Sequence, residues 1–355
     1  MEDLHRTSDC ARSLSGRSDF AGGKVIDVRV HILAGGDSVN GCRMSEEFIA
    51  SPRVSAALRA LGIGKFTAID EEIKDSLLNA IAASEKVDYA VLLAIDGVYK
   101  NDKLILQESH LVIPNDYIID IARRSARTLF GASVHPYREA KEMIAETFRC
   151  IREGAVLFGW IPSIQRIDPE DSRCIPFYIR LAQERVPLLC HTGHPLTGLS
   201  SEFINRNYNA PCKLRRALDI GVKVIASHCV SSAGRALNSD DNTYLDELLG
   251  MLRKAEKNGW DLYADISPFC TPSGKVYFEC IKNEILQGNI SPSRFVYGSG
   301  FPFAEGEAGE FGMRNLLDCN YHFLLGSGIH DSIVTNTGNV LRMQGTDASI
   351  CQDRT

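Results

Sequence analysis

The segment KVIDVRVHI at residues 24–32 determines how the rest of the chain is interpreted. Its near-continuous apolar character predicts a parallel β-strand that is covered on both faces. Seven further segments of the same kind follow along the chain. They are VDYAVLLAI from Val87, TLFGASV from Thr128, GAVLFGWI from Gly154, VPLLCH from Val186, VKVIAS from Val222, WDLYADI from Trp260 and RFVYGS from Arg294.

Segments with helical periodicity separate these eight predicted strands. Ser51 followed by Pro52 predicts the start of one helix, and Gly62 predicts its end. Four leucines at helical spacing predict another helix, for which Thr243 is the expected N-cap and Gly259 the expected stop. The chain therefore alternates strand and helix throughout.

Eight strand–helix units predict an α/β fold, a (β/α)8 TIM barrel. We expect a single barrel domain over residues 24–344, with loose tails at 1–23 and 345–355. Insertions are expected after the first strand, at about 33–86, and after the fifth strand, at roughly 193–210. A doubly wound open sheet is the structural alternative, but no GxGxxG turn follows the first strand.

The composition is that of a globular protein. Of 355 residues, 44% are hydrophobic and 24% are charged, which excludes collagen-like and wholly disordered chains. With 39 basic and 45 acidic residues the formal net charge is -6, so we expect neither nucleic acid nor an anionic membrane as a partner.

The sequence also predicts a cytoplasmic protein. No stretch reaches the ~18 apolar residues of a membrane span, and residues 1–23 lack the apolar core of a signal peptide. The 11 cysteines are irregularly spaced, and Cys190 and Cys229 lie inside apolar runs. Buried thiols of this kind are typical of reduced proteins, so no disulfide framework is expected.

Polar side chains gather where the predicted strands end, which is where barrel enzymes place their active sites. Each one alone also fits a structural role, such as bonding a loop or capping a turn. Convergence on one mouth favours a functional role for His31, His191 and His228. The full set of strand-end residues is Arg29, His31, Asp96, His135, His191, His228, Asp265 and Ser299.

Five segments carry a resemblance to a known family. The segments IDVRVHI, WIPSIQRIDPEDSRCIPFY, PLLCHTG, IASHC and VYGSGFPF occur in the order and spacing of the amidohydrolase-related (amidohydrolase 2) family of metal-dependent TIM-barrel hydrolases. The chain resembles the branch with aminocarboxymuconate-semialdehyde decarboxylase-type enzymes from about Val25 to Met343. The resemblance implies a divalent ion at the mouth, most plausibly zinc, and cleavage of amides, esters or lactones or non-oxidative decarboxylation.

The family's site carries over only in part. His31 and His191 match metal ligands of the family, and His228 matches a ligand or catalytic histidine. The family's first strand ends in His-x-His, but the first of these positions holds Arg29. The family's aspartate on the eighth strand is replaced by Gly300. A lysine that related sequences often carry on the fourth strand is replaced here by Gly159.

These replacements predict a metal site that is weak or absent. The charge of Arg29 repels another positive unit charge about 4 Å away by ~4 kcal/mol at an effective dielectric constant of 20. The repulsion of a divalent ion is about twice as large. The cofactor is therefore either a divalent ion or none. We assign catalytic roles to His228, Arg29 and Asp265 and substrate contacts to Arg29, Trp160 and His135.

Two functions remain open from the sequence. One is a hydrolase or decarboxylase with a weakened or rebuilt metal site, acting on a small carboxylate-bearing substrate. The alternative is a metal-free pseudoenzyme or ligand-binding barrel in which Arg29 takes the place of the metal. The expected partner is a small molecule, and a homodimer is an expectation from the family resemblance.

Overall fold

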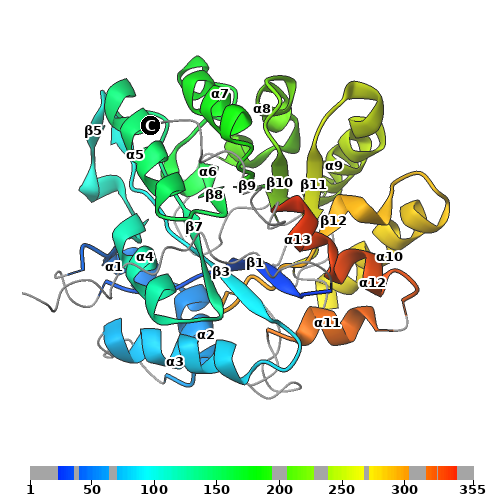
Figure 1. Cartoon of the computed structure of the whole chain (residues 1–355), viewed down its shortest axis with the longest axis horizontal. Coiled ribbons are helices and arrows are strands. Elements are labelled where there is room, and N and C mark those ends of the chain that lie inside the picture. Colours follow the sequence, from blue (N-terminus) through cyan, green and yellow to red (C-terminus); the bar gives the residue numbers. More distant parts are fainter. Residues whose placement is uncertain are drawn as a thin grey trace, which may run out of the picture.

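The computed structural model describes residues 23–35, 40–63, 70–193, 206–227, 239–267, 272–303, 317–325 and 327–341. Within them an eight-stranded parallel sheet contains every strand that the sequence predicts (Figure 1). In order around the sheet the strands are β1 (Ile26–Val30), β3 (Tyr89–Leu93), β7 (Thr128–Ala132), β8 (Leu157–Trp160), β9 (Leu188–His191), β10 (Val224–Ser227), β11 (Leu262–Asp265) and β12 (Phe295–Val296).

Backbone hydrogen bonds between β1 and the segment that begins with β12 close the sheet into a barrel. The Val28 N–H donates to the Tyr297 carbonyl at 3.0 Å, and the His31 N–H donates to the Phe301 carbonyl at 2.8 Å. In the opposite direction the Gly300 N–H donates to the Arg29 carbonyl at 3.0 Å. The predicted TIM barrel is confirmed, and the open-sheet alternative is wrong.

Helices surround the strands on the outside of the barrel (Figure 1). Those that follow the strands include α4 (Asn115–Arg124), α5 (Ala140–Arg152), α7 (Ile175–Glu184), α8 (Arg215–Asp219), α9 (Ser239–Asn258) and α10 (Pro272–Leu286). The described chain ends with α11 (Cys319–Leu324), α12 (His330–Val334) and α13 (Asn336–Val340).

Local signals set most helix ends as predicted. The helix α2 (Pro52–Ala60) begins after Ser51, whose hydroxyl accepts the Val54 N–H at 3.3 Å, and Gly62 follows it with a φ of +78°. Gly259 likewise follows α9 with a φ of +66°. The predicted N-cap Thr243 is wrong, because α9 already begins at Ser239.

The barrel has two hydrophobic layers. One fills the interior and the other lies between strands and helices, as alternation along each strand requires. The interior is closed at the N-terminal end of the strands by α13, whose Val340 packs into it and whose Val340 carbonyl accepts a 2.6 Å hydrogen bond from Lys223. The interior layer consists of Ile26, Val28, Val91, Leu93, Leu129, Leu157, Leu189, Ile225, Val296, Val340 and Leu341.

Both predicted insertions are present. After β1 the chain forms β2 (Arg43–Met44), α1 (Glu46–Ile49), α2 and α3 (Asp70–Ala83) before returning at β3. After β9 the described part of the second insertion is a turn of 3-10 helix, Arg206–Asn209. A third insertion, between β3 and α4, was not predicted. It contains a hairpin of β4 (Tyr99–Lys100) and β5 (Lys103–Leu104). It also contains β6 (Leu111–Val112), which pairs with β2.

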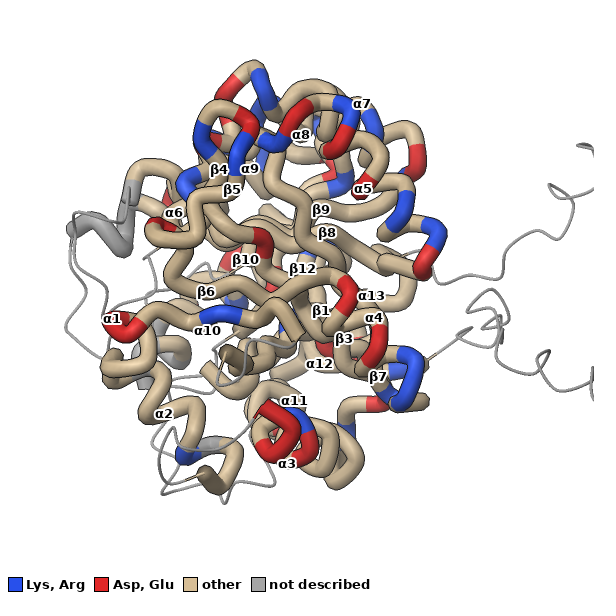
Figure 2. The backbone as a smooth tube through the Cα atoms, turned by 90° about the vertical axis from the view of Figure 1, so that its left-hand side faces the viewer, with Lys and Arg blue, Asp and Glu red and all other residues tan. Residues whose placement is uncertain are grey.

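Charges of both signs are interspersed on the outer helices in the view of Figure 2. This distribution agrees with the small net charge of the chain, -6. Across the described residues, none of the helices has the length and apolar character that crossing a membrane demands.

Candidate functional site

A pocket opens at the carboxyl end of the barrel strands, the end opposite α13. It contains about 300 Å³ of space, including the part open to solvent. Its wall is largely apolar, and its polar side chains come from β1, β9, β10 and the turn after β8. The lining residues are Arg29, His31, Leu93, Ala94, Ile95, Gly159, Trp160, Ile161, Gln165, Leu189, His191 and Ser227.

The structure brings Arg29, His31 and His191 together in this pocket, and we call these three residues the polar cluster. All three side chains are buried, at 3%, 6% and 5% exposure. His31 comes from the end of β1, and its ring meets that of Phe303 edge-on with centroids 5.6 Å apart. His191 ends β9 beside Ser227 of β10. His228 lies outside the described residues.

Arg29 contacts Asp265 at the end of β11 and Ser267 in the turn that follows it. Its Nε lies 3.1 Å from Oδ2 of Asp265, and both side chains are almost completely buried. Its Nη2 donates to the hydroxyl of Ser267. The planar guanidinium is therefore held by an ion pair at Nε and a hydrogen bond at Nη2.

Two glycines after β12 provide the space in which Arg29 and Asp265 meet. A Cβ at Gly298 would lie 3.3 Å from Cβ and Cγ of Asp265 and 3.4 Å from Cγ2 of Val28. A Cβ at Gly300 would lie 2.5 Å from Nη2 of Arg29 and 3.1 Å from its Cζ. The guanidinium thus occupies the space that a side chain at position 300 would need.

Asp265 has its acceptor positions filled from three directions. Oδ2 accepts the Ser227 hydroxyl at 2.6 Å in addition to facing Arg29. Oδ1 accepts the Ser267 N–H at 3.0 Å and also the Ser267 hydroxyl. The residue is fully buried. This carboxylate, to which the sequence assigned a catalytic role, is directed toward Arg29 and the two serines.

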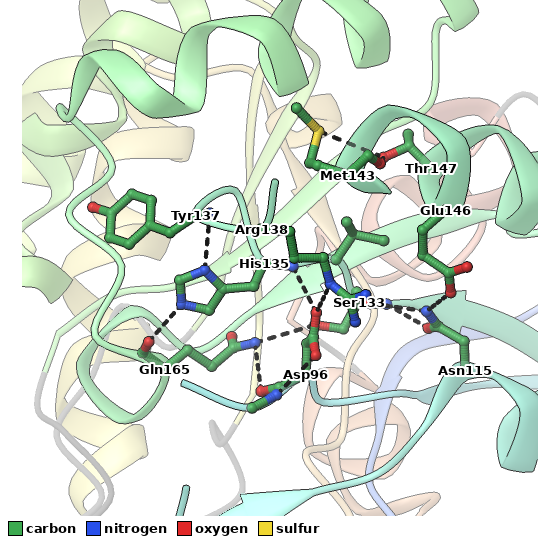
Figure 3. Close-up of polar contacts among 12 residues, drawn as sticks. Asp96, Asn115, Ser133, His135, Tyr137, Arg138, Met143, Glu146, Thr147 and Gln165 are labelled. Atoms are coloured by element: carbon green, nitrogen blue, oxygen red, sulfur yellow. Dashed lines mark hydrogen bonds and ion pairs between the residues drawn. The ribbon is translucent and has the colours of Figure 1, made fainter. Parts of the chain in front are cut away.

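His135 is not among the residues that line the pocket, although it contacts one of them, Gln165 (Figure 3). Its Nδ1 accepts the Tyr137 N–H at 3.1 Å, and its Nε2 donates to the Gln165 carbonyl at 2.8 Å, which assigns the neutral tautomer. Burial lowers the pKa of this imidazole to about 4. The structure therefore places both ring nitrogens of His135 in hydrogen bonds with the backbone.

The wall next to His135 is held by Asp96 and Gln165, which sequence reasoning left without a role (Figure 3). Asp96 Oδ2 accepts the His135 N–H and the Arg138 Nε–H, each at 2.8 Å. Gln165 donates to the Asp96 carbonyl at 3.1 Å and accepts the Ile161 N–H at 2.7 Å. These contacts tie the carboxyl ends of β3, β7 and β8 together.

Two further predicted residues line the pocket from β8. The Trp160 indole donates to the Val134 carbonyl at 2.9 Å and stacks on Phe177 with centroids 4.9 Å apart, so the ring belongs to the layer under the helices. A Cβ at Gly159 would lie 3.6 Å from Leu93, an ordinary contact distance. Position 159 therefore has room for a side chain, unlike position 300.

Asp27 is a residue that sequence reasoning missed, although it stands two positions before Arg29 in an apolar strand. Its Oδ1 accepts the N–H groups of Arg29 and Ser299 at 2.9 and 3.0 Å. Its Oδ2 has no hydrogen-bond partner in the described structure. Burial raises the pKa of this carboxyl to about 7 against the opposing hydrogen bonds and the nearby Arg29.

The described donors do not fit a divalent ion. His31 and His191 line the pocket, but the guanidinium of Arg29 fills the neighbouring space, and the nearby carboxylate of Asp265 is already paired. Across the described ranges, no group of three His, Cys, Asp or Glu side chains is arranged to hold a metal. A catalytic zinc usually takes three protein ligands, so the described residues supply too few.

Comparisons with known proteins identify the fold. No family model and no curated protein matches the sequence. An uncharacterised TIM-barrel protein from Bordetella bronchiseptica is similar in structure, with a TM-score of 0.60 and 16% identity over 91% of this chain and 100% of that one. A candidate 2-pyrone-4,6-dicarboxylic acid hydrolase from Pseudomonas putida follows, with a TM-score of 0.55 and 12% identity over 90% and 98%.

A third similar structure is 5-carboxyvanillate decarboxylase from Novosphingobium aromaticivorans, which was solved with manganese and 4-hydroxy-3-methoxy-5-nitrobenzoic acid. Its TM-score is 0.53, and the two chains are 12% identical over 90% of this chain and 96% of the decarboxylase. At such identities the likeness concerns the fold alone. This chain thus has the TIM-barrel fold that such hydrolases and decarboxylases share, in agreement with the resemblance found in its sequence.

Proposed function

We propose that the pocket binds a small molecule bearing a carboxylate or an ester or lactone carbonyl, and that Arg29 takes the place of a divalent ion there. The observation that carries this proposal is the position of Arg29. Its guanidinium fills the space next to Gly300, in the pocket that His31 and His191 also line. The apolar wall suits the carbon skeleton of such a ligand, and the polar cluster suits its oxygens.

The chemistry in this proposal uses the chain's own side chains. A guanidinium donates hydrogen bonds to carboxylate or carbonyl oxygens and so stabilises negative charge that develops on them. The two imidazoles of His31 and His191 belong to the side-chain type that most often transfers protons in enzymes. Hydrolysis of an ester or lactone and decarboxylation of an unsaturated acid are the reactions consistent with this arrangement. Binding without turnover is the non-catalytic form of the same proposal.

A second candidate is a metal-dependent hydrolase or decarboxylase. It is favoured by one observation: His31 and His191, which match the family's metal ligands, line one pocket. It requires a further ligand from outside the described residues, for which His228 is the candidate.

Two measurements separate the candidates. The first is elemental analysis of protein purified without chelator; near-stoichiometric zinc, manganese or iron would defeat the guanidinium-based proposal in favour of the second candidate. The second is calorimetric titration of small carboxylic acids, esters and lactones into wild type and Arg29→Gln. We expect Arg29→Gln to lose at least tenfold in affinity, while Ser291→Ala on the surface serves as control.

Turnover of the same compounds separates an enzyme from a binding protein. We expect His191→Ala and His228→Ala to abolish any turnover that wild type shows. If wild type turns over none of the compounds but binds some of them, the non-catalytic form of the proposal stands.

A further inference from the structure

The ion pair between Arg29 and Asp265 has a consequence for the kind of ligand the pocket accepts. The two side chains are 4% and 0% exposed, and their closest charged atoms are 3.1 Å apart. Together they contribute no net charge to the carboxyl end of the barrel. A ligand that approaches Arg29 therefore also approaches the negative charge of Asp265.

The position of Asp265 is fixed independently of any ligand. Ser227 donates to Oδ2 at 2.6 Å, and the Ser267 N–H donates to Oδ1 at 3.0 Å. Ser267 also bridges the pair, since its hydroxyl donates to Asp265 and accepts from Nη2 of Arg29. The carboxylate is thus anchored on β10 and on the turn after β11, and through it the guanidinium is anchored as well.

The missing side chains at Gly298 and Gly300 let this pair form across the segment that follows β12. A Cβ at Gly298 would approach Asp265 to 3.3 Å, and a Cβ at Gly300 would approach Arg29 to 2.5 Å. Arg29 extends from β1 past these two glycines to reach Asp265 of β11. Burial makes such a pair sensitive to any further charge, because water screens it poorly.

We propose that Asp265 is a positioning residue that fixes and neutralises the Arg29 guanidinium, so that the pocket selects a ligand with a single carboxylate over one with two. This inference rests on the proposed function. A single carboxylate on the ligand is attracted by the guanidinium of Arg29. A second negative charge in the same small pocket meets Asp265, and the described lining residues include no further Lys or Arg side chain to balance it.

Benzoate and isophthalate are matched probes, because they differ by one carboxylate on the same ring. Their dissociation constants are measured by calorimetry for wild type, Arg29→Gln, Asp265→Asn and Ser267→Ala. We expect wild type to bind benzoate at least tenfold more tightly than isophthalate. Asp265→Asn leaves the positive charge of Arg29 unbalanced, so it should reverse or erase this preference. A ratio that stays unchanged in Asp265→Asn overturns the inference.

Ser267→Ala keeps both charges and removes the bridge, so it covers the case in which Asp265→Asn does not fold. We expect it to weaken benzoate binding several-fold and to keep the preference for benzoate. Unchanged benzoate affinity in Ser267→Ala overturns the positioning role.

The two proposals fail in different ways. Failure of wild type to bind either probe, or full retention of benzoate binding in Arg29→Gln, defeats the proposed function and this inference with it. Loss of benzoate binding in Arg29→Gln, together with an unchanged benzoate-to-isophthalate ratio in Asp265→Asn, defeats this inference alone.

Discussion

Arg29 and Gly300 share a space that holds only one side chain, since a Cβ at Gly300 would lie 2.5 Å from Nη2 of Arg29. Gly300 also has a φ of +72°, which L-residues with a side chain rarely adopt. The arginine at position 29 and the glycine at position 300 are therefore one linked feature of this barrel.

Gly300→Ala should be more destabilising than its backbone conformation alone explains. Gly288 is the matched control, because its φ is +74° and a Cβ there would meet nothing within 4 Å. We expect Gly300→Ala to lower the free energy of unfolding by about 1–3 kcal/mol more than Gly288→Ala, the typical cost of overpacking. Urea unfolding of both variants measures the difference.

The same comparison in an Arg29→Met background identifies the cause. Removing the guanidinium frees the space, so the two alanine substitutions should then cost about the same. Equal costs already in wild type would contradict the steric link between Arg29 and Gly300.

A histidine at position 29 and an aspartate at position 300, which the family resemblance implies, should produce metal binding only when both are introduced together. Gly300→Asp alone places a carboxylate against Arg29, where it meets a cation rather than a free site. Arg29→His with Gly300→Asp removes that cation and adds two donors, so zinc retained after dialysis should rise well above wild type. Adding His31→Ala should reduce it again. Zinc uptake by Gly300→Asp alone would argue against the role given to Arg29.

The buried carboxyl of Asp27 should make stability fall as pH rises. Its pKa is raised from 3.8 to about 7 by burial, so between these values the unfolded chain loses a proton that the folded chain keeps. The contribution of Asp27 to the free energy of unfolding therefore falls by up to about 4 kcal/mol from pH 4 to pH 7 and levels off above. Asp27→Asn keeps an acceptor for the two N–H groups and should lose this slope. Unfolding midpoints are measured across pH 4–8 for both proteins. If they change with pH equally in wild type and Asp27→Asn, Asp27 does not contribute the slope.

His135 should produce the opposite slope. Burial lowers its pKa from 6.5 to about 4, so between these values the unfolded chain binds a proton that the folded chain does not. The free energy of unfolding falls by up to about 3 kcal/mol as pH drops from 6.5 to 4. The two slopes oppose each other in wild type. His135→Asn should therefore show a steeper loss of stability with rising pH, and Asp27→Asn a steeper gain.

His135→Asn also tests the substrate contact that the sequence suggested. Both ring nitrogens bond to backbone, and the residue does not line the pocket. We expect the variant to bind benzoate as wild type does at a temperature where it remains folded. A tenfold loss of affinity would place His135 back among the ligand contacts.

The architecture could be predicted from the sequence because parallel strands leave a strong signal. Runs such as VDYAVLLAI are apolar on both faces, and only strands buried on both faces need that composition. The insertion between β3 and α4 left no such signal, because its strands β4, β5 and β6 are two residues long each. Pairing of segments this short depends on tertiary contacts rather than on local pattern.

Only the part of the candidate site that lies at the strand ends could be predicted from the sequence. Period-2 alternation directs Gly159, His191 and Ser227 to the interior, and the pocket contains them. The Arg29–Asp265 pair could not be predicted, since it depends on the absence of side chains at Gly298 and Gly300, in the segment between the two partners. Nor could the orientation of His135, which depends on a carbonyl supplied by Gln165 thirty residues later.

The shared space at Arg29 and Gly300 also makes changes at these two positions depend on each other. A side chain introduced at position 300 meets the guanidinium unless Arg29 moves or is replaced. We therefore expect substitutions at positions 29 and 300 to be tolerated together more readily than one at a time.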